Sequence, residues 1–351
     1  MDAPNRKFPV AEARRLVDDL FEPKGWIYWP DFLLSAGLGW SAFTLAIILP
    51  APSWQWTLAV LVSGFGLFRA VIFIHELTHL RKDLFGPFRF VWNLVCGIPL
   101  MVPSFTYMGV HIDHHKQKIY GTRYDGEYYP YILTDPRKMI KSVAMTFILP
   151  FVFILRFAVI FPISYLKPSW RRYIWQNASS LAEGPDYKRP FPTPSEARVF
   201  FLQEFLASVV AWTGIILMAK GIWPLRLLLV WYLTAMIILF TNSLRTLVAH
   251  CYRNGPDNVL EFGDQFLDSV NVPGNSLITP LWAPVGLRFH GVHHLFPGMP
   301  YHNLGKAHRR LAEKLSDKEL YMTTCRSGLW AGIAQLWREA KEAEAKRAQA
   351  G

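Results

Sequence analysis

Residues 32–79, FLLSAGLGWSAFTLAIILPAPSWQWTLAVLVSGFGLFRAVIFIHELTH, contain an apolar run that is long enough to cross a membrane twice. No charged residue occurs between Phe32 and Arg69, and the sequence PAPS at 50–53 divides the run in two. A transmembrane helix needs about 20 apolar residues to cross about 30 Å of hydrocarbon. We therefore predict two spanning helices, over about 32–49 and 56–75, joined by a hairpin turn.

A second pair of spans is predicted over about 199–218 and 225–250, with the short turn KGIWP at 220–224 between them. Charged residues make up 18% of the 351 residues, below the roughly 25% of soluble domains, so the composition also favours a membrane protein. The net charge of +11 accompanies no nucleic-acid-binding motif, and a cytosolic face against anionic lipid accounts for it. The three cysteines lie far apart and are expected to be free: Cys96, Cys251 and Cys325.

The apolar stretch over 143–166, between the two hairpins, is interrupted. It contains Pro150 and Pro162, and Arg156 lies near its middle. Proline removes a helix hydrogen bond and introduces a kink, and an isolated arginine is costly in lipid. We expect a re-entrant or interfacial segment here rather than a full span.

Lysine and arginine are concentrated on one side of this arrangement. The N-terminal arm and the segments 81–141 and 167–198 are basic, whereas the turn at 51–55 has no basic residue and the turn at 220–224 has one. The positive-inside rule then places both termini in the cytoplasm, and a bacterial inner membrane is the expected location. We predict a single all-α integral membrane domain, divided into an N-terminal arm (1–30), a bundle of four spans with cytosolic insertions (32–250) and a cytosolic cap with a C-terminal tail (251–351).

Nine of the 11 histidines are grouped in a way that indicates a metal site. They are His75 and His79 in HELTH, His111, His114 and His115 in HIDHH, His290, His293 and His294 in HGVHH, and His250 at the end of the fourth predicted span. Helix positions i, i+3 and i+4 share a face, so each motif can direct several imidazoles to one place. Three motifs are too many ligands for one ion, and imidazole suits iron, zinc and copper alike. The sequence therefore predicts two metal ions without naming the element.

Two other classes of protein explain this pattern less completely. HELTH matches the H-E-x-x-H signature of zinc metalloproteases, but such an enzyme needs one further ligand and leaves both H-x-x-H-H motifs without a role. A metal transporter would place its ionisable ligands at mid-membrane depth. Here the histidines gather at helix ends on one side.

With HELTH, HIDHH and HGVHH in this order, and FPGMPYHNL after the third, the chain resembles the membrane fatty acid desaturase superfamily over about residues 70–310. The resemblance implies a cytosolic helical cap that carries two iron ions on the nine histidines, O₂ as co-substrate, and electrons from a separate ferredoxin or cytochrome b5-like protein. It implies oxidation of an unactivated C–H bond in a lipid acyl chain, with desaturation expected and a lipid or carotenoid hydroxylase or ketolase as the alternative. Thr246 stands where stearoyl-type desaturases have an asparagine, four residues before His250, which argues against a close stearoyl-type relative.

Several polar residues near the motifs are expected to support the site or to bind the electron donor. Carboxylates can orient metal-binding imidazoles through the second ring nitrogen, and the candidates by position are Glu76, Asp113, Asp264 and Asp268. His302 and His308 fall in a predicted basic amphipathic helix at the membrane face, as surface or supporting residues. An acidic electron donor is expected to dock on basic residues of the cytosolic side: Arg81, Lys82, Lys116, Lys118, Arg309 and Arg310.

One ion pair is also predicted within the bundle. Arg69 lies six residues before His75, and Glu204 lies a similar distance into the third span. At 1.5 Å per residue, both side chains would start roughly 9 Å below the same interface. Since an unpaired charge in lipid is costly, we predict that Arg69 pairs with Glu204.

Overall fold

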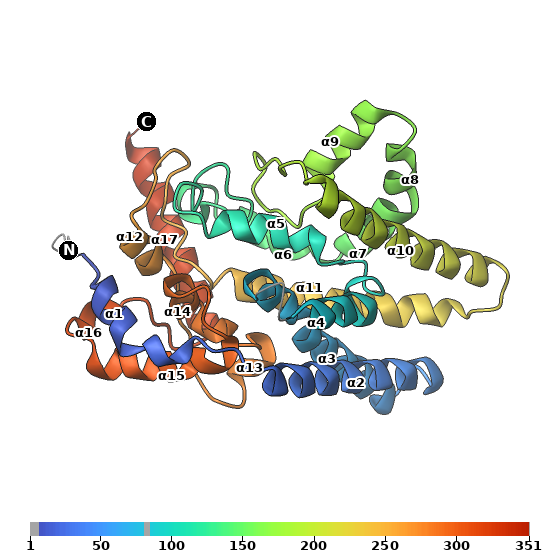
Figure 1. The fold of residues 1–351 in the computed structure, drawn as a ribbon, viewed down its shortest axis with the longest axis horizontal. Coiled ribbons are helices and arrows are strands. Elements are labelled where there is room, and N and C mark those ends of the chain that lie inside the picture. The colour runs from blue at the N-terminus through green and yellow to red at the C-terminus, as the bar shows by residue number, and fades with distance from the viewer. Residues whose placement is uncertain (1–6, 81–84, 351) are drawn as a thin grey trace.

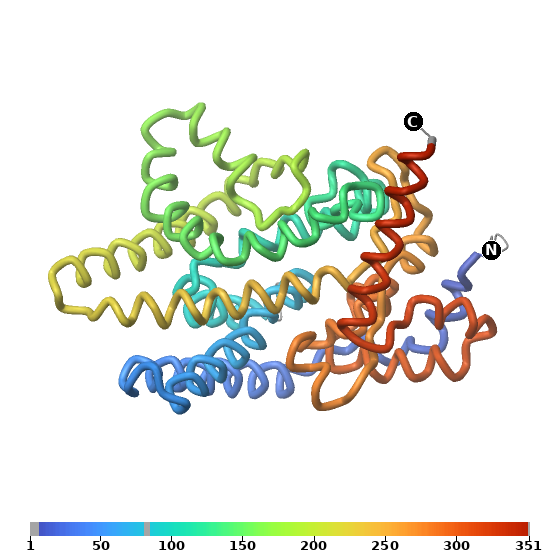
Figure 2. Tube along the Cα trace, turned by 180° about the vertical axis from the view of Figure 1, so that it is seen from behind, coloured from blue at the N-terminus to red at the C-terminus, as the bar shows by residue number. Residues whose placement is uncertain are grey.

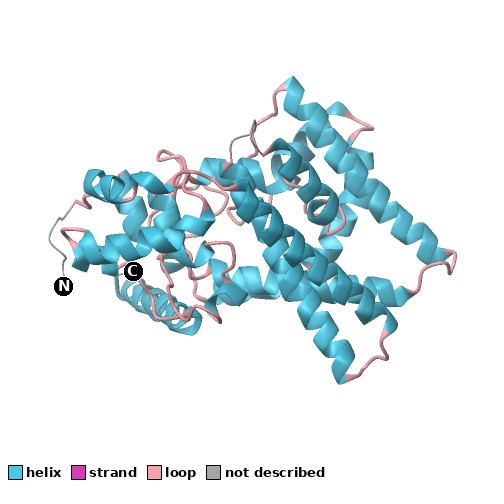
Figure 3. Ribbon diagram, turned by 60° about the horizontal axis from the view of Figure 1, so that its bottom comes forward, coloured by secondary structure: helices cyan, strands magenta, loops and turns pink. Residues whose placement is uncertain are grey.

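The computed structural model describes residues 7–80 and 85–350, and this part of the chain is built of helices, turns and loops (Figures 1 and 3). Its α-helices are α1 (Val10–Leu16), α2 (Gly25–Ile48), α3 (Trp54–His79), α4 (Gly86–Trp92), α5 (Phe105–His114), α6 (Arg137–Met145), α7 (Leu149–Leu155), α8 (Phe161–Ser164), α9 (Pro168–Ala178), α10 (Pro194–Ala219), α11 (Leu225–Thr246), α12 (Phe262–Asp268), α13 (Thr279–Trp282), α14 (His290–Leu295), α15 (Tyr301–Lys314), α16 (Lys318–Met322) and α17 (Leu329–Ala350). Short 3-10 or π-helical turns are η1 (Asp18–Leu20), η2 (Asn93–Gly97), η3 (Tyr131–Leu133), η4 (Arg156–Ile160) and η5 (Leu287–Phe289). The prediction of an all-α fold is confirmed.

Four helices are long and apolar enough to cross a membrane: α2, α3, α10 and α11. They correspond to the four predicted spans. Helices α2, α3 and α10 begin earlier than predicted, at Gly25, Trp54 and Pro194, whereas α11 begins at Leu225 as predicted. Large apolar side chains such as Leu34 and Ile48 are mostly exposed on their outer faces, as expected where the surroundings are lipid. The prediction that the fourth span continues to His250 was wrong, because α11 ends at Thr246.

Helices α2 and α3 pack closely along their length because glycines face each other. A Cβ on Gly39 would lie 2.6 Å from Cγ of Leu67, and one on Gly66 would lie 3.0 Å from the Cα of Gly39. A Cβ on Gly64, also in α3, would lie 2.6 Å from Cγ2 of Ile237 in α11. Small residues allow the backbones of membrane helices to approach closely. Helix α3, which carries the first histidine motif, is thereby held between α2 and α11.

The segment predicted to be re-entrant or interfacial is bent. Helices α6 and the run from α7 through α8 meet at 52°, and together they are either one broken span or a re-entrant loop. Pro150 and Pro162 occupy the first turns of α7 and α8, where a missing N–H is tolerated. Arg156 lies in the π-helical turn between them, so the backbone departs from a regular helix at each of the residues that suggested an interruption.

The predicted pairing of Arg69 with Glu204 was wrong. Arg69 instead donates from Nε and Nη2 to the two carboxylate oxygens of Asp31, at 2.7 and 2.5 Å. Glu204 accepts from Arg156 at 2.5 Å and also from Arg171. Because α2 extends to Gly25, Asp31 lies inside the bundle and supplies a partner that an apolar span starting at 32 does not contain.

Helices α1, α12 and α14 to α17 form a cap at one end of the bundle, near both ends of the chain, whereas α4 and α6 to α9 lie beside the spans (Figures 1 and 2). Glu76 of α3 attaches this cap, because its Oε2 accepts from the Tyr28 hydroxyl at 2.6 Å and from the backbone N–H of Tyr301 at 3.1 Å. At the opposite end, the two hairpin turns are linked by a hydrogen bond from the Arg226 side chain to the Leu49 carbonyl. The histidine motifs lie at the cap end of the spans.

Candidate metal centre

Four separate segments supply the nine histidines. The last turns of α3 carry His75 and His79, the end of α5 carries the HIDHH motif, and α14 carries HGVHH. His250 follows α11 and forms an isolated antiparallel bridge with Ser269. Val270 N donates to Ala249 O at 2.8 Å, and Gly291 N donates to Val270 O at 3.0 Å. These two hydrogen bonds bring the segment around His250 against α14.

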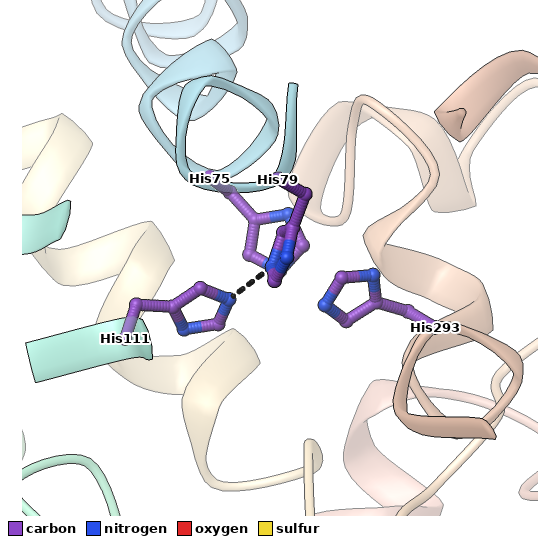
Figure 4. Close-up of side chains that lie close together, drawn as sticks. All are labelled: His75, His79, His111 and His293. Carbon is purple, nitrogen blue, oxygen red and sulfur yellow. Dashed lines mark hydrogen bonds between the residues drawn. The ribbon is translucent and has the colours of Figure 1, made fainter. Parts of the chain in front are cut away.

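Eight of these histidines form two groups of four. In the first group, one nitrogen of each of His75, His79, His111 and His293 lies within 4.8 Å of the others (Figure 4). The second group, by the same measure, is His114, His250, His290 and His294. Each group draws on at least three segments of the chain, so the arrangement depends on the tertiary fold.

His115, the ninth predicted ligand, lies between the two groups. Its Nε2 is 3.2 Å from Nε2 of His111 and 3.0 Å from Nε2 of His293, both in the first group. Its ring stacks on that of His294, in the second group, with centroids 4.4 Å apart. His115 is therefore placed to bind in the first group or to contact both.

The chemistry of this donor set fits a pair of metal ions. Both ring nitrogens of His75 and the Nδ1 atoms of His290 and His293 are buried and have no hydrogen-bond partner among the described residues. Burial, together with neighbouring imidazoles, holds the pKa of His111, His115 and His250 well below the ordinary value. A neutral imidazole is the form that binds metal. A buried nitrogen that has no hydrogen-bond partner destabilises a protein unless a metal ion binds it.

Two of the imidazoles contact, through Nδ1, acidic side chains that were not predicted from the sequence. Nδ1 of His111 lies 3.0 Å from Glu127, and Nδ1 of His114 lies 2.8 Å from Asp125. Such contacts fix the ring orientation and would leave Nε2 free to bind a metal ion. Burial raises the pKa of Glu127 to about 8. Burial alone would lower the pKa of His114, but the nearby carboxylates of Asp125, Glu127 and Asp268 together raise it.

His250 is supported through a relay. Its Nδ1 lies 2.8 Å from the Tyr120 hydroxyl, which donates to Asp268 at 3.1 Å, and Asp268 also accepts from Tyr128 at 2.8 Å. Burial raises the pKa of Asp268 to about 6, against the hydrogen bonds that favour its ionised form. Of the four carboxylates predicted to orient imidazoles, Asp268 thus serves the site through Tyr120.

Other expectations for residues near the motifs are corrected by the structure. Glu76 contacts Tyr28 and Tyr301, and its closest approach to His75 is 3.7 Å, which is beyond hydrogen-bonding range. Asp113 accepts from Lys116 at 2.6 Å and from Tyr187 at 3.0 Å. No hydrogen bond to an imidazole is found for Asp264 within the described part of the chain.

The two histidines outside the motifs remain apart from the metal centre. His302 lies near the start of α15, and its Nε2 accepts from the backbone N–H of Lys24 at 3.3 Å. His308 is buried, and its Nδ1 lies 2.7 Å from the Tyr321 hydroxyl. Of the two roles expected for His308, surface or supporting, the surface role was wrong, since His308 is buried and contacts Tyr321 of α16.

Comparison with known proteins agrees with this geometry. Residues 51–326, which include all nine histidines, match the family described as fatty acid desaturase. The chain belongs to this family. It is also 39% identical over 335 residues, 95% of each chain, to a ceramide hydroxylase of Caulobacter vibrioides. The protein is therefore an oxidoreductase of the desaturase-like superfamily, whose members act on lipids and include hydroxylases.

Proposed function

We propose that this protein is an O₂-dependent hydroxylase of ceramide-class lipids. The observation that carries the proposal is the pair of buried four-histidine groups at the cap end of four apolar helices. The 39% identity to a ceramide hydroxylase along nearly the whole chain favours hydroxylation over the desaturation expected from the sequence. Ceramide is a membrane lipid, so the substrate can enter from the bilayer that surrounds the spans.

The reaction inserts one oxygen atom of O₂ into a C–H bond of the lipid and reduces the other to water, with two electrons and two protons from a donor. Two iron ions, held by the eight grouped histidines and His115, would supply the oxidising power that no protein side chain has. The chain's own residues position these ligands. Glu127, Asp125 and Tyr120 each hold one Nδ1 nitrogen, so that Nε2 of the same ring faces the centre.

The proposal includes a membrane orientation and an electron donor. Both ends of the chain lie with the cap (Figure 1), and the positive-inside bias of the sequence puts this end in the cytoplasm. A soluble ferredoxin or cytochrome b5-like protein would then reach the cap from the cytosol. We treat the whole chain as one domain, since the histidines come from the bundle and the cap together.

The products of a reconstituted reaction test the proposal. Purified, iron-loaded protein with ceramide, O₂ and a reducing system should yield ceramide that has gained one oxygen atom, as measured by mass spectrometry. A product that has lost two hydrogens instead would identify a desaturase. Absence of any ceramide product, with turnover of another lipid in the same preparation, would refute the substrate assignment.

The metal assignment is tested by His293→Ala. His293 belongs to the first histidine group, so the variant should hold less iron per chain and lose turnover. His302→Ala is the matched control, because His302 is a half-buried histidine of the cap that contacts Lys24 rather than the two groups. Equal iron content in the His293 variant and the wild type would contradict the assignment.

A further inference from the structure

Five tyrosines form an unbroken series of ring contacts that leads from the second histidine group to the surface. The centroids of successive rings lie 5.5, 5.2, 5.1 and 5.0 Å apart. Aromatic rings attract one another at centroid distances of about 4.5–7 Å, so every neighbouring pair is in contact. We call this series the tyrosine chain, and its members from the inside outward are Tyr120, Tyr128, Tyr252, Tyr131 and Tyr129.

The inner end of the tyrosine chain lies against the metal centre. The Tyr120 hydroxyl is 2.8 Å from Nδ1 of His250. The Tyr120 ring also packs against three imidazoles of the second group, with centroids 5.1, 5.5 and 5.4 Å away: His114, His250 and His294. Tyr120 is therefore in direct contact with residues that would bind one of the two metal ions.

The outer end of the tyrosine chain is open to solvent, whereas the rest of it is covered. Tyr129 is half-buried, and its hydroxyl accepts a hydrogen bond from the exposed Lys138 at 2.6 Å. The other four tyrosines are at most 2% exposed, and Leu336 and Ala340 of α17 belong to the same apolar cluster. Soluble molecules can thus reach the chain at Tyr129 without reaching the histidines.

The buried tyrosines also have acceptors for their hydroxyl protons. Tyr120 and Tyr128 both donate to Oδ2 of Asp268, at 3.1 and 2.8 Å, and Tyr131 donates to Glu183 at 3.3 Å. A phenol that loses one electron becomes a strong acid and releases its proton. A carboxylate that already accepts the hydrogen bond takes up this proton without rearrangement. Packing requires only the rings, whereas oxidation by one electron requires both the hydroxyls and their acceptors.

The chemistry of tyrosine sets the direction of electron transfer. A phenol gives an electron to a strong oxidant, but a ferredoxin-like donor cannot reduce it further. The tyrosine chain therefore conducts only when an oxidant at its inner end first removes an electron from Tyr120. In the proposed reaction, such oxidising power is left unused when O₂ reacts at the centre with no lipid to oxidise.

We propose that the tyrosine chain carries oxidising equivalents from the metal centre to the surface when O₂ reacts there without a lipid in place. This inference rests on the proposed function, because it requires reduction of O₂ at the centre. Tyr120 gives an electron to the centre and its proton to Asp268, and each following ring then reduces the ring before it. A tyrosine that is reduced regains its proton from the same acceptor. At Tyr129, which exchanges its proton with water, a soluble reductant of the ascorbate class supplies the replacement electron.

The tyrosine chain supplies the electrons that a missing lipid would have given. Reduction of O₂ to two water molecules takes four electrons and four protons. In hydroxylation the donor supplies two electrons and the lipid C–H bond supplies two. Without a lipid, the second pair passes one electron at a time from ascorbate, which becomes dehydroascorbate and releases its protons to water, while the centre takes up as many protons from water. The competing oxidation of the histidine ligands is thereby avoided.

A reaction with O₂ in the absence of lipid tests the inference. Iron-loaded, full-length protein is reduced with a stoichiometric amount of dithionite and exposed to O₂, with catalase present to remove released peroxide. Electron paramagnetic resonance of samples frozen during the reaction should show a tyrosyl radical, and mass spectrometry of peptides should locate stable oxidation products at Tyr129. Ceramide should lower both signals several-fold because it supplies the missing electrons. Ascorbate should lower the amount of Tyr129 product because it reduces that ring.

Tyr131→Phe keeps the ring but removes the oxidisable hydroxyl, so it interrupts the tyrosine chain next to its outer end. This variant should form several-fold less product at Tyr129 and more at Tyr120 and Tyr252, with the iron content of the wild type. Tyr129→Phe is a second variant, on which folding depends less because the side chain is half-buried. Its tyrosyl radical should persist in ascorbate, whereas the radical of the wild type should be quenched.

Tyr321→Phe is the matched control, because Tyr321 is a fully buried tyrosine whose ring contacts Phe266 and His308 rather than the tyrosine chain. It should form as much Tyr129 product as the wild type. Tyr124, which is 63% exposed, reports on attack by diffusing oxidants. More oxidation at Tyr124 than at Tyr129 overturns the inference, and so does equal oxidation of Tyr129 in the wild type and Tyr131→Phe. If Tyr131→Phe loses iron, the ascorbate response of Tyr129→Phe decides, and quenching equal to that of the wild type overturns the inference.

The same preparation separates this inference from the proposed function. Hydroxylation of ceramide by a wild type that forms no tyrosyl radical in the lipid-free reaction overturns the inference alone. A tyrosyl radical and Tyr129 product in a protein that does not hydroxylate ceramide support the tyrosine chain and refute the substrate assignment. Failure of the iron-loaded wild type to reduce O₂ defeats both.

Discussion

At the scale of single residues, Asp125 is the acid that contacts His114, one of the proposed metal ligands. It is fully buried and accepts from Gly121 N at 2.8 Å and Glu127 N at 2.9 Å as well as contacting His114 at 2.8 Å. In Asp125→Asn, the amide N–H₂ would face one of these donors and the negative charge behind the imidazole would be lost. We expect metal retention to fall about 10- to 100-fold, measured as iron remaining after dialysis against a chelator.

Asp113→Asn is the control for this prediction. Asp113 has the same chemistry and is also buried, but it contacts Lys116 and Tyr187 rather than an imidazole. Its variant should retain iron as the wild type does. Equal iron loss from the two variants would mean that the support of His114 by Asp125 has no special effect.

His308 gives a prediction about pH. Burial, aided by the charges of Arg288 and Arg309, lowers the pKa of His308 to about 4 in the folded protein, against about 6.5 when unfolded. Between these values only the unfolded state binds the proton, so stability falls as the pH is lowered through this window. The loss at pH 5 should be about 2 kcal/mol. His308→Gln should remove that part of the pH dependence of thermal unfolding, and an unchanged slope between pH 7 and 5 would contradict the prediction.

The residues of the centre were predictable to different degrees. The histidines could be found because i, i+3 and i+4 spacing leaves a signal within a few residues, and the structure brings all nine together. Asp125, Glu127 and Tyr120 lie in a loop after α5, where no periodicity tells which side chain turns inward. Glu76 was predicted to orient an imidazole because it follows His75 in the sequence. Its side chain contacts Tyr28 and the cap instead.

At the scale of elements, one ion pair joins two spans, and double-mutant cycles can distinguish it from the pairing predicted from the sequence. Arg69 and Asp31 join α3 to α2 with limited exposure of both side chains. Loss of one partner leaves a poorly solvated charge, so Arg69→Met and Asp31→Asn should show a coupling energy of about 1–3 kcal/mol in thermal unfolding. Arg69→Met with Glu204→Gln should be additive within about 0.5 kcal/mol, because Glu204 contacts Arg156 and Arg171. Coupling in the second cycle but not the first would restore the pairing predicted from the sequence.

The helices themselves were predicted better than their ends. Apolar length specifies that a span exists, and all four spans are present. The ends depend on polar contacts that hydropathy does not measure. Helix α2 begins before its apolar core and thereby includes Asp31, and α11 stops before His250 because that segment bridges to Ser269.

At the scale of the whole molecule, the metal centre depends on segments that are distant in sequence. His114 contacts His294 at 3.2 Å, although 180 positions separate them. The sequence indicates that such ligands share one end of the bundle, but their division into two groups of four requires the fold of the cap on α3 and α11. This arrangement explains why the cap, rather than any single motif, determines which histidines meet.

Electrons for the proposed reaction have to reach the centre from a separate donor protein. Of the basic residues expected to dock a donor, Arg81 and Lys82 lie outside the described residues, Lys116 pairs with Asp113, and Arg310 pairs with Asp19. Lys118 and Arg309 are exposed and have no ion pair with a described acid. Since an unpaired charge contributes more to long-range attraction than a neutralised one, these two residues should contribute most to binding an acidic donor.

Lys118→Glu and Arg309→Glu should each slow reduction of the iron-loaded protein by an acidic ferredoxin several-fold at low salt, and should reduce the salt dependence of that rate. Charges are screened over about 10 Å at 0.1 M salt, so the variants and the wild type should converge as ionic strength rises. Lys220→Glu is the matched control, because Lys220 is exposed at the turn between α10 and α11, at the end opposite the cap (Figure 1). An equal decrease in the Lys220 variant would show that net charge, rather than the cap surface, governs the encounter. A wild-type rate that does not change with ionic strength would exclude electrostatic docking at this face.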